Sequence, residues 1–191
     1  MSYIESILIA LSFGIDSMIV MRNQAEKTNI RLTRAIGVSA LISIIGVAMI
    51  ILGIFIGDIL RFETPDSPTA YTATNTLVFV GLTVVVTIRT LWGSLKHESN
   101  IAYDISRWST VIALAIALGI NLLIYGIGVG FLYHSEHIET TVCLPLFPCL
   151  FLLNYLGIMF GRQKTPLRER RWKILSSVLL LSIAIYCVID M

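Results

Sequence analysis

Six long apolar stretches recur along the chain and limit its fold more than any other feature. They run at roughly 3–21, 35–60, 73–92, 109–133, 142–160 and 173–189. A helix needs about 20 apolar residues to cross the hydrocarbon core of a bilayer, which is ~30 Å thick. Only 14% of the residues are charged, against about a quarter in soluble domains. The sequence therefore predicts an all-α integral membrane protein with six transmembrane helices.

The basic residues gather in alternate connections between these stretches. They lie at 22–34, 89–107 and 162–173, and only Arg61 belongs to an opposite connection. Lys and Arg are retained on the cytoplasmic side of a membrane, so we expect a multi-pass protein of the cytoplasmic (inner) membrane with both termini outside. We interpret the 162–173 cluster as a topology anchor, with binding of anionic lipid headgroups as the alternative.

Two parts of the sequence resemble each other. ALSFGIDSMIV (10–20) aligns with AIALGINLLIY (115–125), and LGIFIG (52–57) aligns with LGIMFG (156–161), at offsets of 105 and 104 residues. The similar offsets indicate an internal repeat of three helices.

Because each repeat crosses the membrane an odd number of times, the second repeat starts on the opposite side and has inverted topology. The sequence thus predicts two inverted three-helix repeats, at 1–92 and 109–191, joined by a cytoplasmic loop at 93–108. Secondary transporters often have this architecture, with the substrate site near the midplane where the repeats meet.

Asp16 lies well inside the first apolar stretch. An ionised carboxylate at the centre of a bilayer costs about +2.5 to +3.5 kcal/mol on insertion scales, so we expect Asp16 to face the interior of the bundle. Without a cation the carboxyl should hold a proton, and a metal ion and a proton would then compete for it. The alternative is a protonated Asp16 that hydrogen-bonds to a neighbouring helix.

Further polar residues surround this acid in the predicted bundle. Asn121 is the counterpart of Asp16 in the repeat, and Ser12 and Tyr125 each lie one helical turn from these two residues. Asn154 is the remaining deep polar residue, with a helix–helix hydrogen bond as its alternative role. Oxygen ligands of this kind suit magnesium, calcium or manganese better than copper or zinc. We predict a divalent metal site formed by Asp16, Asn121, Ser12, Tyr125 and Asn154.

The motifs resemble those of the MntP-type manganese exporters of bacteria, in the superfamily of LysE-like exporters. The resemblance rests on ALSFGIDSMIV in the first stretch, ALGINLLIYGIGVG in the fourth and LGIMFGR in the fifth. It implies a six-helix inverted repeat that exports manganese(II).

The chain departs from the family pattern at several site positions. Asn121 stands where the family has a second aspartate, and Gly46 stands where its second helix often has a glutamate. Gly14 replaces a serine, and Ser176 and Ser177 replace a glycine pair. A single carboxylate can hold a magnesium-like ion if water supplies the other ligands. We expect weaker binding than in the family, and the sequence leaves the ion open.

Two other motifs lie near the ends of the fourth and fifth stretches. HSEHIE (134–139) is interpreted as an exposed loop, with a metal site as the alternative. Cys143 and Cys149 are interpreted as apolar packing, with a disulfide or a soft-metal site as alternatives. Pro145 and Pro148 should kink or delay the fifth helix.

We therefore predict an exporter of a manganese-like divalent cation, coupled to protons, in which one repeat rocks against the other. The cation is its substrate, and no cofactor is expected. The sequence has no phosphate-binding loop, H-E-x-x-H or G-x-S-x-G motif, so we expect neither an enzyme nor a nucleic-acid-binding protein. Two alternatives stay open: a non-transporting membrane scaffold, and an exporter of a small amino-acid-like solute. The oligomeric state is also open, a homodimer included.

Overall fold

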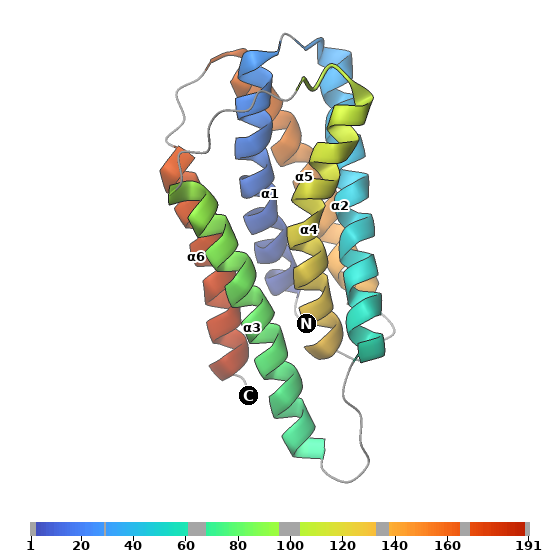
Figure 1. Ribbon diagram of the computed structural model, residues 1–191, viewed down its shortest axis with the longest axis vertical. Helices are drawn as coiled ribbons and strands as arrows, with labels where there is room; N and C mark the ends of the chain where they lie inside the picture. The colour runs from blue at the N-terminus through green and yellow to red at the C-terminus, as the bar shows by residue number, and fades with distance from the viewer. Residues whose placement is uncertain are drawn as a thin grey trace.

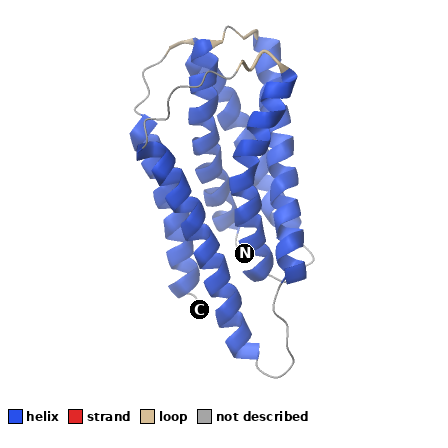
Figure 2. Ribbon diagram, in the orientation of Figure 1, coloured by secondary structure: helices blue, strands red, loops and turns tan. Residues whose placement is uncertain are grey.

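The computed structural model describes residues 3–28, 30–60, 68–95, 104–132, 138–164 and 169–189, which form six α-helices and no strand. The helices are α1 (Tyr3–Lys27), α2 (Leu32–Leu60), α3 (Pro68–Leu95), α4 (Trp108–Leu132), α5 (Ile138–Arg162) and α6 (Glu169–Ile189). Each helix coincides with one of the six apolar stretches. The all-α fold predicted from the sequence is confirmed (Figure 2).

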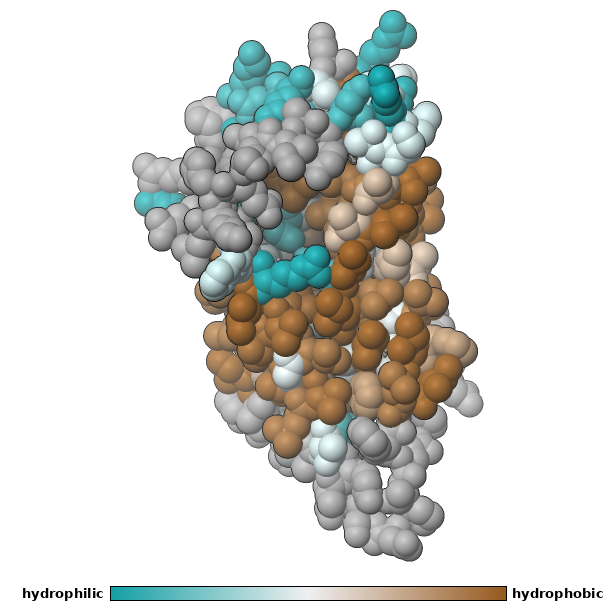
Figure 3. Space-filling view, in the orientation of Figure 1, coloured by the Kyte–Doolittle hydropathy of each residue, from teal (hydrophilic) through white to brown (hydrophobic). Residues whose placement is uncertain are grey.

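Four of these helices, α2, α3, α4 and α5, are long and apolar enough to cross a bilayer, and α1 and α6 are not among the four. Large apolar side chains of the spanning helices face outward, including Phe55, which is 60% exposed, and Leu144, which is 71% exposed. On the face shown in Figure 3, apolar residues form a broad belt, and most of the hydrophilic residues gather at the upper end. Such a surface requires hydrocarbon around it, so the chain is a multi-pass membrane protein.

The helices pack as a bundle in which α1 crosses α5 and α2 crosses α4 most extensively (Figure 1). The other main contacts join α2 to α5, α3 to α4, α1 to α6 and α3 to α6. The first three helices correspond in order to the last three: α1 to α4, α2 to α5 and α3 to α6. Replacing each helix by its counterpart gives the same six contacting pairs. We call the upper end of the bundle in Figure 1, where α2, α4 and α6 begin, the basic end, since it carries Arg22, Arg34, Arg107 and Arg162.

Glycines bring the backbones of α2 and α4 into direct contact. A Cβ atom built at Gly53 would collide with the carbonyl oxygen of Leu123, and one at Gly57 with the carbonyl oxygen of Ile127. Any side chain at these two positions would therefore push the helices apart.

The crossing of α1 and α5 has the same construction. Here a Cβ atom at Gly157 would collide with the carbonyl oxygen of Met18, and one at Gly161 with that of Arg22. Gly157 and Gly161 are the counterparts of Gly53 and Gly57, at an offset of 104 residues. Met18 and Arg22 are the counterparts of Leu123 and Ile127, at an offset of 105 residues. The similarity of the two halves thus extends to individual backbone contacts.

The start of α4 is fixed to the start of α2 at the basic end. The backbone N–H of Ser106 donates to Asp104 Oδ1 at 3.0 Å, and Arg107 lies 3.6 Å from the Asp104 carboxylate. Arg34 of α2 donates to the carbonyl oxygen of Ser106 and stacks 4.9 Å from the ring centre of Trp108. The described part of the connecting loop is therefore a turn that leads directly into α4.

The structure also places the remaining motifs. Cys143 and Cys149 are free thiols, partly buried against the larger apolar core, as the packing interpretation predicts. Pro145 and Pro148 lie inside α5, so they do not delay this helix, since neighbouring helices in a bundle can satisfy the freed backbone groups. The side chains of the 134–139 motif lie outside the described residues.

Candidate metal site

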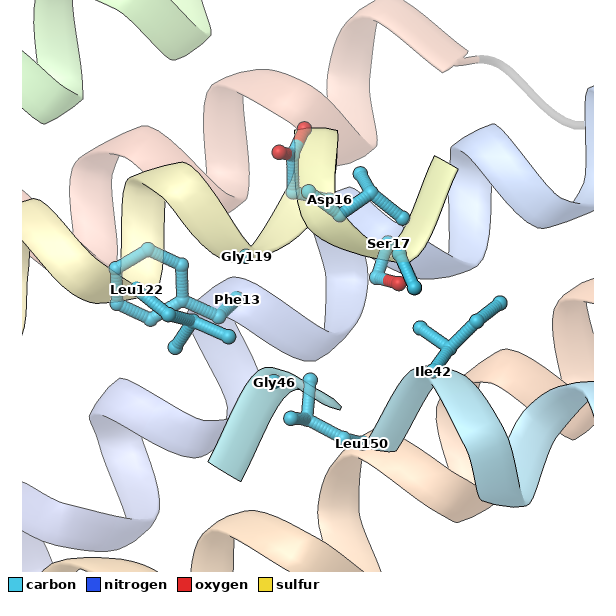
Figure 4. Close-up of a pocket in the computed structure, with 10 residues that line it drawn as sticks. Phe13, Asp16, Ser17, Ile42, Gly46, Gly119, Leu122 and Leu150 are labelled. Atoms are coloured by element: carbon cyan, nitrogen blue, oxygen red, sulfur yellow. The ribbon is translucent and has the colours of Figure 1, made fainter. Parts of the chain in front are cut away.

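A cavity lies inside the bundle where α1, α2, α4 and α5 meet, and Figure 4 shows its lining. It has room for about one water molecule, which is also roughly the size of one metal ion. Its lining residues come from four helices: Phe13, Asp16 and Ser17 of α1; Ile42 and Gly46 of α2; Ala115, Leu118, Gly119 and Leu122 of α4; and Leu150 of α5.

The cavity separates two apolar clusters of the core. The larger cluster contains Phe13, Leu122 and Leu150, and the smaller one, nearer the basic end, contains Ile42 and Ala115. Six of the lining residues form pairs that the repeat relates: Phe13 with Leu118, Ser17 with Leu122, and Gly46 with Leu150. The cavity thus lies where the two halves of the chain meet.

Asp16 is the acidic residue among those that line the cavity. It is partly buried, and in Figure 4 its carboxylate points away from Gly46 and Leu150, so it lies at the edge of the cavity. A carboxylate beside a cavity inside an apolar bundle is a candidate ligand for a cation.

Ser17 is a site residue that the sequence prediction missed. It lines the cavity beside Asp16, is 4% exposed, and donates its hydroxyl proton to Asn154 Oδ1 of α5. The sequence signal was a second polar side chain directly after the buried acid. The helix–helix hydrogen bond given as the alternative role of Asn154 is present, but the sequence did not indicate Ser17 as its partner.

Asn154 lies behind Ser17 and is fully buried. Its Nδ2 group has no hydrogen-bond partner in the part of the chain that the structure describes. Asn154 is not a lining residue of the cavity, so it contacts the candidate site through the Ser17 hydroxyl.

Ser12 is engaged in a contact between α1 and α6. Its hydroxyl donates to the carbonyl oxygen of Ser176 at 2.7 Å, and the Ser176 hydroxyl donates to the carbonyl oxygen of Ser12 at 2.9 Å. These reciprocal bonds hold the two helices together one turn from Asp16.

Tyr125 is buried in an aromatic group on the side of the cavity away from the basic end. Its ring packs edge-on against Phe13 at 5.5 Å and against Phe79 at 5.7 Å between ring centres. Phe13 lines the cavity on that side, and the rings of Tyr125 and Phe79 support it from behind.

Asn121, the counterpart of Asp16, is partly buried. Its Oδ1 atom is shielded from solvent and has no hydrogen-bond partner among the described residues. The structure thus places Asp16 and Ser17 in the cavity lining and joins Ser17 to Asn154. It leaves Asn121, Ser12, Tyr125 and Asn154 itself outside the lining. Within the described ranges no three His, Cys, Asp or Glu side chains come together as a metal cluster.

A multi-pass bundle with an acid lining an internal cavity is an arrangement found among membrane transport proteins. A family model described as "Putative manganese efflux pump" matches residues 29–188. The chain therefore belongs to this family, the MntP family, as its motifs suggest.

Neither a curated protein nor a solved structure matches the chain. The family match begins after α1, so it covers Gly46, Gly119 and Asn154 but neither Asp16 nor Ser17. It is the packing of α1 against α5 that attaches these two residues to the matched part of the chain.

Proposed function

We propose that this protein exports a divalent metal cation, manganese above all, across the inner membrane in exchange for protons. Asp16 binds the cation and takes up a proton when the cation leaves. One observation carries the proposal: the acid that the sequence places inside an apolar helix lines a cavity between the two halves of the bundle.

The chemistry of the lining favours a hard metal ion. Asp16 and Ser17 offer oxygen atoms, and the other lining side chains are hydrocarbon or hydrogen. Oxygen ligands with added water suit manganese and magnesium better than copper or zinc. In this conformation the cavity has the space of about one water molecule, so binding of an ion needs less opening of the bundle than binding of an amino-acid-like solute.

The packing supports two inverted repeats, 1–92 and 109–191, each with three spans. The main helix pairs are unchanged when the halves are exchanged. The glycines of α2 meet α4 as their counterparts in α5 meet α1. Rocking one such repeat against the other would open the cavity to each side of the membrane in turn.

The orientation follows from the charges. The basic end faces the cytoplasm, so the aromatic group of Phe13, Phe79 and Tyr125 lies on the outer side of the cavity. We propose that these rings form the outer gate, which closes while the ion enters from the cytoplasm.

The test is the Asp16→Asn variant in cells exposed to excess manganese. We expect it to lose metal resistance and to accumulate manganese, because a neutral amide cannot supply the charge that draws the ion into the bundle. Asp58→Asn is the matched control, since Asp58 is an exposed acid near the end of α2. Full resistance in a folded Asp16→Asn protein would contradict the proposal.

Proton coupling is tested in proteoliposomes that contain a pH-sensitive dye. Manganese flux should carry protons the opposite way, and Asp16→Asn should abolish both fluxes. Unchanged cellular content across a panel of divalent ions, with and without the protein, would favour the scaffold alternative.

A further inference from the structure

We infer that the Ser17 hydroxyl oxygen is the second protein ligand of the transported cation, and that Asn154 is the residue that positions it. This inference rests on the proposed function, because it assumes that a cation occupies the cavity beside Asp16. It assigns a role to Ser17, and it gives Asn154 a positioning role in place of the ligand role expected from the sequence.

The lining of the cavity limits which side chains can bind the cation. Besides Asp16, Ser17 is the one lining residue whose side chain carries an oxygen or nitrogen atom. The other eight are Phe, Ile, Leu, Ala and Gly residues. A cation that enters and sheds part of its water can therefore replace it with one neutral side-chain oxygen, that of Ser17.

The hydrogen bond to Asn154 decides which way this oxygen acts. A serine hydroxyl has one proton to donate and two lone pairs that accept. Its proton is taken by Asn154 Oδ1, so what Ser17 can present to the cavity is lone-pair density. Lone pairs bind a cation, whereas a hydroxyl proton turned into the cavity would repel it.

If Asn154 served packing alone, its amide would lower the stability of the folded protein. It is fully buried, and its Nδ2 donor lacks a hydrogen-bond partner among the described residues. A buried amide that leaves a donor unpaired lowers stability. An aliphatic side chain at this position would avoid that cost, but it would not hold the Ser17 proton away from the cavity.

The resulting set of protein ligands is hard: one carboxylate and one hydroxyl. Replacing the hydroxyl with a thiol would make the set softer, because sulfur prefers soft ions such as cadmium. Ion preference is therefore a direct measure of whether the Ser17 side chain contacts the ion.

The first experiment compares Ser17→Ala and Ser17→Cys with the unchanged protein in proteoliposomes, using manganese and cadmium as the transported ions. Ser17→Ala should lower the apparent manganese affinity by about tenfold or more, the scale on which ligand-shell changes act. Ser17→Cys should shift the cadmium-to-manganese preference by about tenfold toward cadmium. Purified Ser17→Cys protein with cadmium should also show the ultraviolet charge-transfer band of a cadmium thiolate.

The matched control is Ser43, which is also fully buried and lies on α2 outside the cavity lining. Its hydroxyl donates at 2.7 Å to the carbonyl oxygen of Ser39 in its own helix. Ser43→Ala and Ser43→Cys should leave both the manganese affinity and the ion preference unchanged.

The second experiment separates positioning from packing at Asn154. Asn154→Leu keeps the branching and the number of side-chain heavy atoms but removes the acceptor, so it should raise the KM for manganese with little change in maximal rate. Asn154→Asp restores an oxygen acceptor for the Ser17 proton and should restore the KM.

The outcomes distinguish a failure of this inference from a failure of the proposed function. If Asp16→Asn abolishes manganese flux while the folded Ser17 variants keep the original affinity and ion preference, Ser17 is not a ligand and only the inference fails. If Asn154→Leu leaves the KM unchanged, the positioning role fails. If the unchanged protein moves no divalent ion, the proposed function fails with it.

Discussion

The α2–α4 crossing and the α1–α5 crossing have the same backbone construction but different chemistry. In both, two glycines spaced four residues apart lie against carbonyl oxygens of the partner helix. The α2–α4 crossing also has glycines on the other side, because Gly126 and Gly130 of α4 lie against the carbonyl oxygens of Ile50 and Ile54. That crossing is a direct backbone contact from both sides.

At the α1–α5 crossing only the glycines of α5 lie against backbone, because Gly14 of α1 faces the side chain of Leu153. Met18 and Ala25 are among the residues that face Gly157 and Gly161, and the Ser17–Asn154 hydrogen bond lies at the same contact. Asp16 and Ser17 both line the cavity from this crossing. The glycine–backbone contacts are therefore present at both crossings, whereas the polar side chains of the candidate site lie at the α1–α5 crossing.

This difference indicates that the two crossings behave differently during transport. Dispersion holds the α2–α4 crossing together, and tight backbone packing offers no alternative set of partners. The α1–α5 crossing includes a polar contact beside the ion, and this contact can respond to ion binding. We therefore expect the α2–α4 crossing to act as the pivot about which one repeat rocks, while the α1–α5 crossing changes more during transport.

The largest effect is expected from Gly57→Ala at the α2–α4 crossing. The added Cβ atom would collide with the carbonyl oxygen of Ile127, and backbone atoms cannot move aside as a side chain can. Overpacking of a core costs about 1–3 kcal/mol and sometimes more, so the melting temperature in detergent should fall clearly. Gly81→Ala is the control, because nothing lies within 4 Å of a Cβ built there.

Gly161→Ala makes the corresponding change at the α1–α5 crossing. Its Cβ atom would meet the carbonyl oxygen of Arg22 and the side chain of Ala25. If the two crossings are equivalent in packing, the loss of stability should approach that of Gly57→Ala. A tolerated Gly161→Ala beside a damaging Gly57→Ala would break the equivalence of the two halves.

A double-mutant cycle of Ser17→Ala and Asn154→Leu tests the polar contact that distinguishes the α1–α5 crossing. Interhelical hydrogen bonds in a membrane bundle contribute about 0.6 kcal/mol on average, with a maximum of about 1.7 kcal/mol. We expect a coupling in the upper part of that range, because both residues are almost fully buried. A coupling near zero in reversible unfolding would remove the chemical difference between the crossings.

The smallest effect is expected at Asp104, outside both crossings. Hydrogen bonds from Ser106, aided by the nearby Arg107, hold the pKa of the Asp104 carboxyl below its ordinary value of 3.8. A lowered pKa stabilises the folded state fully above pH 3.8, and this stabilisation is lost as the pH falls through the lowered pKa. Unfolding of Asp104→Asn should therefore differ slightly from that of the unchanged protein at neutral pH, and the difference should vanish in strong acid.

The sequence alone determined the helices and their internal similarity. Hydrophobicity and length are properties of each segment, so six apolar stretches predicted six helices without knowledge of their partners. The alignment also pairs Gly53 and Gly57 with Gly157 and Gly161, and in the structure the paired glycines make corresponding backbone contacts. Asp16 stood out for the same reason, since one acid in an apolar run is visible without any neighbour.

Only the tertiary structure decided which side chains share the cavity. It placed Ser17 beside Asp16, set Asn154 behind Ser17, and left Asn121 and Ser12 outside the lining. In a membrane both the lipid-facing and the buried sides of a helix are apolar, so the pattern of residues does not record how each helix is rotated. Rotation and register follow from the glycine contacts between helices, and they determine which oxygen atoms meet.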